Sequence, residues 1–431
     1  MNEDDSLQLA SFLRNYGYEE TFDVNEADIA ILVTCSVREK PENKAKSKLG
    51  ELRILKESKP HMIIGICGCM AQREGDKLKK GRNYLDFVAG TGNISQIPSM
   101  IENVKNSKKY SSSLHIPEKA SDVLILPKRT KNKNPKLKEF VPIMYGCNNF
   151  CAYCVVPYVR GRERSRNEKD ILDEIKYLLD DGTKEITLLG QNVNSYKGEN
   201  QVTFADLLYK ISEINGNFRI RFTTSHPKDM SNELIEAMKI TKVCKHVHLP
   251  VQSGDNEILE KMNRKYDKER IYELVSKLRN TVPDIAISTD LIVGFPFEGD
   301  NEFQNTMDMV KNIEFDWAYM FSFNPIPNTP AAEMPDQMTM KEKNTKLDKL
   351  VKLQNSITVN KNKSLVGNIY EVLVESYSKR DETKFTGQST HGKTVNFSYN
   401  NENNVKIGDF VKVRTKSGHL YGFSGEILNE Q

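Results

Sequence analysis

Three cysteines close together give this chain its clearest chemical signal. Cys147, Cys151 and Cys154 stand in the segment GCNNFCAYC with the spacing CxxxCxxC. Three thiolates on one short loop can hold three irons of a four-iron, four-sulfur cluster and leave the fourth iron open to a small ligand. A cluster that only carries electrons is normally closed by a fourth cysteine, so the loop predicts a site for chemistry. A zinc site completed by a distant His or Cys, or unrelated thiols, is the alternative.

A second pair of cysteines follows two apolar segments near the beginning of the chain. Cys35 lies in TCSVREKPENK and Cys69 in GCMAQREG, each directly after a candidate strand. A parallel sheet would bring both thiols to the same edge, where they can ligate a second cluster. Cys67, inside the apolar run MIIGIC, is expected to be a buried structural thiol, and Cys244 a core or surface thiol.

Length and composition limit the class of protein. The chain has 431 residues, enough for about three domains of ~150 residues each. It has 28% charged residues and a mean hydropathy of −0.57, and no apolar run approaches the ~18 to 20 residues of a membrane span. The acidic start MNEDDS is unlike a signal peptide, so we expect a cytoplasmic protein without a membrane partner. Seven cysteines in that setting favour metal or redox use over a disulfide framework.

Positive charge is unevenly distributed along the chain. The net charge of +3 is too small to imply a nucleic-acid partner by itself. In KRTKNKNPKLK, residues 128–138, six of eleven residues are Lys or Arg, which we interpret as part of a solvated linker. Residues 105–138 as a whole are rich in Lys, Ser, Asn and Pro, so we predict a basic linker there.

Alternation of strand and helix patterns predicts an α/β protein. In the first hundred residues a helix candidate, LQLASFLRNYG, precedes three apolar strand candidates, which indicates a parallel α/β domain. From Glu139 onward, six strand candidates are separated by amphipathic segments such as KERIYELVSKLRN. Six β/α units are too few for a complete eight-stranded barrel and predict an open, partial (β/α)6 barrel. The six strands are EFVPIMYG, EITLLGQN, RIRFTTS, HVHLPVQ, AISTDLIVGF and WAYMFSF.

Polar side chains cluster at or just after the carboxyl ends of these strands, where barrels carry their functional groups. Any one of them could equally cap a helix or satisfy a strand end. They are Gln191, Asn194, Ser225, His226, Gln252, Ser253 and Asn324.

The end of the chain changes character after a helix-like stretch at 340–363. Five short alternating segments suggest a small closed β-barrel of a kind that often binds nucleic acid. Its basic and aromatic residues could track phosphates and stack on bases, although an accessory barrel without a ligand is equally compatible. These residues are Arg380, Lys384, Lys393, Lys412, Arg414 and Lys416, with Phe385 and Phe397.

The cysteine loop resembles that of the radical S-adenosylmethionine (SAM) superfamily, in which an aromatic residue such as Tyr153 precedes the last cysteine. The resemblance implies that SAM binds the open iron and is cleaved to a 5′-deoxyadenosyl radical. In order along the chain, MNEDDS, TCSVREK, GCMAQREG, GCNNFCAYCVVPYVRGRERSR, LLGQNVNSY, RIRFTTSHP, HLPVQSG, KMNRKY and IVGFP resemble the methylthiotransferase family of radical SAM enzymes.

This resemblance implies four regions. They are an N-terminal methylthiotransferase domain at 1–104, the linker at 105–138, a radical SAM core at 139–363 and a C-terminal TRAM RNA-binding barrel at 364–431. LGQNVNSY and TTSHP resemble the branch that modifies carbon 2 of isopentenyl-adenosine next to the anticodon in tRNA. Methylthiolation of another tRNA base or of a ribosomal protein, or a non-catalytic RNA-binding protein that retains a cluster, are the competing hypotheses.

The resemblance also implies roles for individual residues. Cys147, Cys151 and Cys154 would hold the SAM-cleaving cluster, and Cys35 and Cys69 an auxiliary cluster. One SAM would methylate a sulfur of the auxiliary site, and a second would supply the radical. The expected cofactor contacts are Tyr153, Gln191, Ser225, Gln252, Ser253 and Arg264.

The implied partners are the tRNA anticodon loop, a reducing protein such as flavodoxin or ferredoxin, and a sulfur donor, acting on a monomer. The arginines just after the cysteine loop are expected to meet the tRNA backbone or to form internal ion pairs. They are Arg160, Arg162, Arg164 and Arg166.

Two departures from the family pattern stand out. The family's first auxiliary-cluster cysteine precedes the MN of a GCxMN segment, and this chain begins at that MN. We expect a truncated start, the alternatives being two cysteines with an exogenous ligand or an inactive form. In FPFEGDNEF, residues 295–303, the family usually has a Gly-Glu-Thr stretch, and Phe297 replaces the small residue.

Overall fold

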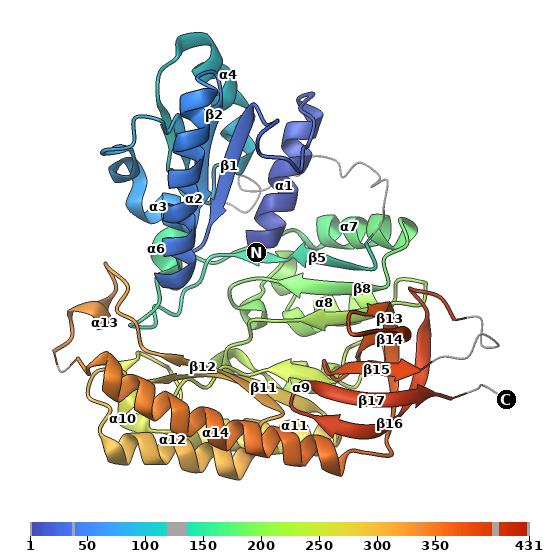
Figure 1. Ribbon diagram of the computed structural model, residues 1–431. Coiled ribbons are helices and arrows are strands. Elements are labelled where there is room, and N and C mark those ends of the chain that lie inside the picture. The colour runs from blue at the N-terminus through green and yellow to red at the C-terminus, as the bar shows by residue number, and fades with distance from the viewer. Residues whose placement is uncertain (1, 37–38, 119–135, 336, 399–404, 429–431) are drawn as a thin grey trace. The chain divides into compact units, whose positions relative to one another are not determined.

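A computed structural model describes residues 2–36, 39–118, 136–335, 337–398 and 405–428 (Figure 1). The chain forms two compact units, each considered by itself. The first comprises Met1–Asn132, Pro142–Arg166 and Asn324–Glu333, and the second comprises Lys133–Val141, Asn167–Phe323 and Met334–Gln431.

The first unit contains a parallel four-stranded sheet in the order β1-β2-β3-β4. The strands are β1 (Ile29–Thr34), β2 (Ile63–Gly68), β3 (Phe87–Ala89) and β4 (Ser111–Ser113). All residues of β2 are buried, as expected for a parallel strand covered on both faces. The helices are α1 (Asn2–Asn15), α2 (Glu39–Ser58), α3 (Cys69–Glu74) and α4 (Ile97–Ser107).

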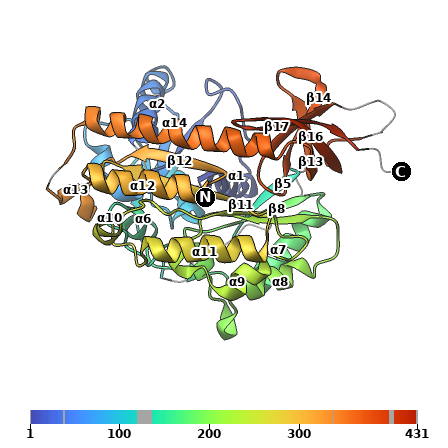
Figure 2. The ribbon, with the colours of Figure 1, turned by 90° about the horizontal axis from the view of Figure 1, so that it is seen from below.

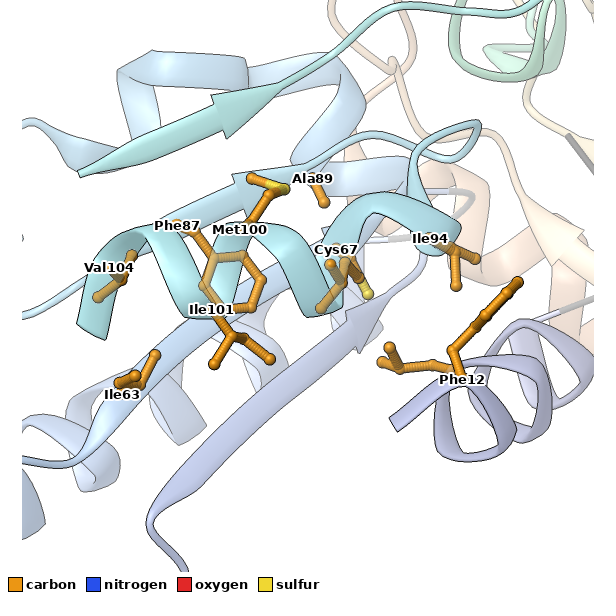
Figure 3. Close-up of a cluster of buried hydrophobic side chains, with 11 residues drawn as sticks. Phe12, Ile63, Cys67, Phe87, Ala89, Ile94, Met100, Ile101 and Val104 are labelled. Atoms are coloured by element: carbon orange, nitrogen blue, oxygen red, sulfur yellow. The ribbon is translucent and has the colours of Figure 1, made fainter. Parts of the chain in front are cut away.

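Apolar side chains alternate between the two faces of this sheet. Ile63, Cys67 and Phe87 pack with residues of α1 and α4 (Figure 3), whereas Ile64 and Ile66 pack with residues of α2 and α3. Gly65 of β2 makes room for the Phe87 ring, since a Cβ there would lie 2.0 Å from the Cζ of Phe87. The parallel α/β domain predicted from the sequence is confirmed.

The segment predicted as a linker contains more structure than its composition suggests. It begins in the last turns of α4 and includes β4, which pairs with β3 from Phe87↔Ser111 to Ala89↔Ser113. Three consecutive serines show no alternation of apolar and polar residues, so the sequence pattern does not predict the strand that they form. Most of the basic run 128–138 lies outside the described residues.

The second unit contains the strands of the predicted partial barrel, in two parts that are joined by a bridge between Ile220 and Val243. One part has the order β5-β8-β9 and the other β10-β11-β12. The barrel strands are β5 (Lys138–Pro142), β8 (Glu185–Leu189), β9 (Arg219–Phe222), β10 (His246–His248), β11 (Ala286–Val293) and β12 (Trp317–Ser322). The helices among them are α7 (Glu168–Asp180), α8 (Phe204–Ser212), α9 (Asn232–Ala237), α10 (Asn256–Lys261), α11 (Lys268–Thr281) and α12 (Asp300–Ile313).

A long helix, α14 (Met340–Ser364), runs along α12 toward the C-terminal strands (Figure 2). A capping box between Thr339 and Glu342 starts it. Of the helices in the described ranges, none has both the length and the apolar character that crossing a bilayer requires.

The last strands close into a barrel in the order β13-β14-β15-β17-β16, which confirms the predicted small β-barrel. Two predicted base-stacking residues, Phe385 and Phe397, are instead buried in its core. Lys393 is also buried, and its Nζ lies 2.8 Å from Asp316 Oδ1, so the prediction that it tracks phosphates is wrong. The strands are β13 (Ile369–Ser378), β14 (Asp381–Ser389), β15 (Thr394–Ser398), β16 (Phe410–His419) and β17 (Gly422–Ile427).

Replacing Cys67 tests its placement in the apolar core. Its side chain is fully buried, and burial raises the pKa of the thiol above its usual range. Cys67→Ser places a hydroxyl among apolar groups and should lower the free energy of unfolding by about 1–3 kcal/mol, measured by urea denaturation. The matched control, Cys67→Ala, should lower the free energy of unfolding by a smaller amount. If the serine variant were the more stable of the two, the apolar surroundings assigned to Cys67 would be incorrect.

Candidate active site

Backbone hydrogen bonds within the first unit hold the cysteine loop. It lies between β6 (Met144–Tyr145) and α6 (Val156–Arg160), and β6 pairs with β7 (Arg164–Ser165). The amide of Cys147 donates to Gly161 O at 3.1 Å, and that of Cys154 donates to Cys151 O at 2.9 Å. Gly146 has a φ of 78°, and a Cβ there would lie 2.0 Å from the carbonyl oxygen of Arg162. Only glycine fits this close approach.

The three thiols of the loop differ in exposure. Cys151 is buried, whereas Cys147 and Cys154 are half-buried. Burial raises the pKa of Cys147 to about 11, against the lowering effect of a hydrogen bond from the Asn149 backbone. Metal binding at Cys147 would therefore have to displace a proton.

Cys35 and Cys69 meet at one edge of the parallel sheet, as predicted. The register pairs Thr34 with Gly68, and the two cysteines directly follow these last residues of β1 and β2. Cys69 begins α3 and packs with Val155, the residue before α6, and with Val159 near the end of α6. The second cysteine pair is therefore a neighbour of the helix that follows the cysteine loop.

A buried ion pair accompanies Cys69. Arg160, at the end of α6, is 5% exposed, and its Nη2 lies 2.5 Å from Oδ2 of Asp5 in α1. Arg160 also hydrogen-bonds the Cys69 side chain, which opposes the rise in the Cys69 pKa caused by burial. Asp5 was missed by the sequence analysis, although it stands in the quoted MNEDDS segment. The prediction of a tRNA contact for Arg160 is wrong, and its alternative, an internal ion pair, is confirmed.

The other arginines of this segment also act mostly inside the protein. Arg164 Nη1 donates to Pro117 O at 2.7 Å, and Arg166, which is buried, donates from Nη1 to Pro142 O at 2.6 Å. Arg162 is exposed, and its guanidinium lies 4.3 Å from the centre of the Phe150 ring. Of the four arginines, Arg162 is the exposed one, and its predicted contact with the tRNA backbone stays a prediction.

Among the described residues, no group of three or more His, Cys, Asp or Glu side chains is arranged so that it could hold a metal ion.

In the second unit, several polar atoms at the strand ends are buried without partners. Within the ranges the structure describes, the side-chain amide atoms of Asn194, Oγ of Ser225 and Nε2 of His226 form no hydrogen bond. Burial, followed by the charges of Arg264 and Lys228, lowers the pKa of His226 to about 2, so its imidazole is neutral. Since an unpaired buried polar group is costly, these atoms fit a polar ligand.

Two residues in these strand-end loops have left-handed backbone conformations. Thr224 has a φ of 69° and Gln252 a φ of 70°, unusual for residues other than glycine. Thr224 Oγ1 donates to Gly190 O at 2.7 Å, which ties the loop after β9 to the loop after β8. The backbone amide of Gln252 donates to Asp290 O of β11 at 2.9 Å. Such strain accumulates where a binding site must be held in one shape.

Ser253 and Arg264 are used largely to hold the loop after β10. Ser253 Oγ lies 3.3 Å from Thr306 Oγ1, and it accepts a hydrogen bond from the Asp255 amide. Arg264 is buried, and its Nη2 donates to Pro250 O at 2.8 Å. Both therefore position the backbone of this loop. Of the remaining predicted contacts, Gln191 in the second unit and Tyr153 in the first are half-buried.

The loop that departs from the family pattern contains a perturbed carboxyl group. Phe297 keeps a φ of 69°, a conformation that favours glycine, and Lys261 Nζ lies 5.2 Å from its ring centre. The next residue, Glu298, is 1% exposed and accepts from the Gly294 amide at 2.8 Å. Burial raises the pKa of Glu298 to about 7, against the lowering effects of that hydrogen bond and of Lys346.

Comparison with known families matches three successive regions. Residues 1–90 match a family described as uncharacterized protein family UPF0004, residues 141–310 the radical SAM superfamily, and residues 363–421 the TRAM domain.

Curated relatives extend over nearly the whole chain. The tRNA-2-methylthio-N(6)-dimethylallyladenosine synthase of Clostridium botulinum (strain Loch Maree / Type A3) is 46% identical over 99% of this chain and 94% of its own length. The protein of that name from Thermoanaerobacter sp. (strain X514) is 44% identical over 99% of this chain and 91% of its own length.

Solved structures share the fold at low identity. The radical SAM methyltransferase TsrM from Kitasatospora setae has a TM-score of 0.57 at 14% identity and covers 76% of this chain and 72% of its own. The cobalamin-dependent SAM radical enzyme OxsB has a TM-score of 0.51 at 13% identity, with coverages of 82% and 55%.

The partial barrel and the three-cysteine loop are those of a radical SAM enzyme, a class that implies a [4Fe–4S] cluster and SAM. The sequence relatives narrow this class: the chain belongs to the tRNA-2-methylthio-N(6)-dimethylallyladenosine synthase family of radical SAM methylthiotransferases.

The ion pair between Asp5 and Arg160 predicts a non-additive effect on stability. Arg160→Met leaves the Asp5 carboxylate buried and unpaired, so the free energy of unfolding should fall by about 3–5 kcal/mol. The double variant Asp5→Asn/Arg160→Met removes both charges. Its loss of unfolding free energy should be smaller than the sum of the losses in the single variants Asp5→Asn and Arg160→Met. Urea denaturation of the three variants measures this coupling. Additive losses would mean that the two charges do not stabilise each other.

Glu298 predicts a pH dependence of stability. Its pKa in the folded chain, about 7, exceeds the ordinary value of 4.5, so between these values the folded chain retains a proton that the unfolded chain releases. The resulting stabilisation is fully present below the ordinary pKa and is lost as the pH rises through 7, at about 1.4 kcal/mol per pH unit. Relative to Glu298→Gln, the wild-type chain should therefore become less stable from about pH 5 to about pH 8 in urea denaturation. A parallel pH dependence in both proteins would contradict this, and Glu213→Gln, at an exposed carboxylate, serves as the control.

Proposed function

We propose that this chain catalyses radical SAM-dependent methylthiolation of carbon 2 of N(6)-isopentenyladenosine next to the anticodon in tRNA. The observation that carries the proposal is the hydrogen-bonded CxxxCxxC loop in a chain that matches curated tRNA-2-methylthio-N(6)-dimethylallyladenosine synthases along almost its entire length. The unpaired strand-end atoms of the second unit support it, since they fit a bound polar cofactor.

Cys147, Cys151 and Cys154 are the proposed ligands of the SAM-binding cluster. When bound, the cluster and SAM supply a radical able to remove hydrogen from an unactivated aromatic carbon, which protein side chains alone do not provide. The chain contributes binding and orientation. Asn194 and Ser225 offer hydrogen bonds to a polar ligand, while the strained Gln252 loop is held in place by Ser253 and Arg264.

Cys35 and Cys69 are the proposed ligands of a second cluster at the edge of the first-unit sheet. Their adjacent positions and the contact of Cys69 with α6 support this assignment. Arg160 supplies positive charge beside Cys69, which favours the thiolate that an iron requires.

The proposed regions are the methylthiotransferase domain at 1–104, the linker at 105–138, the radical SAM core at 139–363 and the TRAM barrel at 364–431. The proposed partners are the anticodon loop of tRNA, a flavodoxin-like or ferredoxin-like reductant and a sulfur donor, with the chain acting as a cytoplasmic monomer. The match of residues 363–421 to the TRAM domain supports the RNA partner.

Expression in a bacterium without its own methylthiotransferase tests the function. The wild-type chain should give 2-methylthio-isopentenyladenosine in tRNA, detected by mass spectrometry of nucleosides, and Cys147→Ala should give none. Cys244→Ala is the matched control, because Cys244 is a buried thiol of the second unit, and it should retain the product.

Iron analysis of the anaerobically reconstituted chain separates the two proposed clusters. Two full clusters predict about eight irons per chain, and Cys35→Ala/Cys69→Ala should retain about four. Methylthiolation of a different base, or none with both clusters loaded, would refute the proposed substrate.

A further inference from the structure

A cavity of about 590 Å³ lies within the second unit. It is lined by barrel strands, by α14 and by residues of the C-terminal barrel. His246 and Trp317, two of its lining residues, are the first residues of β10 and β12, and Thr223 directly follows the carboxyl end of β9. The cavity therefore extends from the amino ends of two strands to the loop after a third. The residues expected to contact the cofactor are not among those that line it.

Two buried side chains line the cavity with polar atoms that have no partner. Arg221 and His246 are each 7% exposed. In the described part of the chain, Nη1 of Arg221 and Nδ1 of His246 make no hydrogen bond, although Arg221 Nη2 contacts Glu185 and Ser389 O, and His246 Nε2 lies 2.9 Å from Ser288 Oγ. Buried polar atoms left open in a cavity indicate a ligand with hydrogen-bonding edges.

The cavity is aromatic as well as polar. Trp317 stacks on His246 with 4.7 Å between ring centres, while Tyr319 and Tyr421 are 54% and 86% exposed. Gly392, with a φ of 76°, keeps the wall open, because a Cβ there would lie 3.0 Å from Trp317. Exposed aromatic rings beside hydrogen-bonding groups are the usual means of holding an unpaired RNA base.

The charges around the wall suit a nucleotide of an RNA chain. Glu185 is shared by Arg219 and Arg221, and Asp316 is shared by Lys361 and Lys393, so each buried carboxylate has two cationic partners. The excess of positive charge attracts the phosphates that flank a base. A flat ring with polar edges also matches the aromatic and the amide-bearing walls of the cavity.

We propose that this cavity binds one unpaired base of the RNA substrate other than the adenosine that is modified. The assignment rests on the proposed function for the identity of the RNA. It makes the junction of the radical SAM core and the C-terminal barrel a place where the anticodon-loop sequence is read. Residues of the radical SAM core and of the C-terminal barrel both line the cavity.

Filling the cavity tests the assignment. Asn355 of α14 lines the cavity and is half-buried, and within the described ranges its side chain forms no hydrogen bond. Asn355→Trp can therefore occupy the space, and Asn355→Ala is the matched control. Binding of a synthetic anticodon stem-loop containing isopentenyladenosine is measured by fluorescence anisotropy without SAM, with an abasic site introduced at each unpaired position in turn. Thermal unfolding confirms that each variant is folded.

For the wild-type chain, an abasic site at one position other than the modified adenosine should weaken binding by about 10-fold. Asn355→Trp should weaken binding to the intact RNA by about 10-fold, and the same abasic site should then have no further effect. Asn355→Ala should bind much as the wild type does. Tyr421→Ala should also weaken binding, whereas Tyr209→Ala, an exposed tyrosine outside the cavity, should not.

The assignment is overturned if Asn355→Trp binds the intact RNA as tightly as the wild type does. It is also overturned if the fold-loss of affinity caused by Asn355→Trp multiplies with the fold-loss caused by the abasic site at every position. A third contrary result is coupling of Asn355→Trp to the modified adenosine itself. Absence of wild-type binding to the RNA overturns it too. Because binding is measured without SAM, a chain that shows the coupling but forms no methylthio product refutes the proposed function and leaves the cavity assignment intact.

Discussion

The first unit depends on the need to neutralise Arg160 in its interior. A guanidinium that is 5% exposed requires a counter-charge, and Asp5 provides it. Because Arg160 ends the helix after the cysteine loop and Asp5 lies in α1, this pair fixes the loop's helix against the first segment of the chain. Cys69 is the third member of the contact. A change at any of these three residues therefore alters the surroundings of Cys69 and of the helix that follows the cysteine loop.

Buried charge also organises the second unit. Glu185 on β8 pairs with Arg219 and Arg221 on β9, and Arg221 donates to the Ser389 carbonyl of the C-terminal barrel. Asp316 binds Lys361 of α14, with Nζ and Oδ2 2.8 Å apart, and Lys393. These contacts give the junction between the two barrels a defined geometry. A defined junction is a suitable place for a cavity with selective hydrogen-bonding atoms.

The parts of the fold with strong periodic patterns were predictable. Apolar runs gave the strands of both barrels, and parallel pairing of β1 with β2 correctly placed Cys35 beside Cys69. Residue types alone do not identify the partner of a charged side chain. Lys393 was therefore taken for an RNA contact and Arg160 was left open between an RNA contact and an internal ion pair, although each has a buried partner distant in sequence. The strain at Thr224 and Gln252 was equally invisible, because only the folded loops impose it.

The serine strand β4 has a consequence for the behaviour of the first unit in concentrated solution. It is an outer strand of the sheet, three residues long, and carries only hydroxyl side chains. An outer strand that is long and apolar is a template on which another chain can add its own strand, the first step of aggregation. With so few polar residues, β4 offers little such template. Among the described residues it is the outer strand on that side of the sheet, and its shortness limits edge-to-edge self-association there.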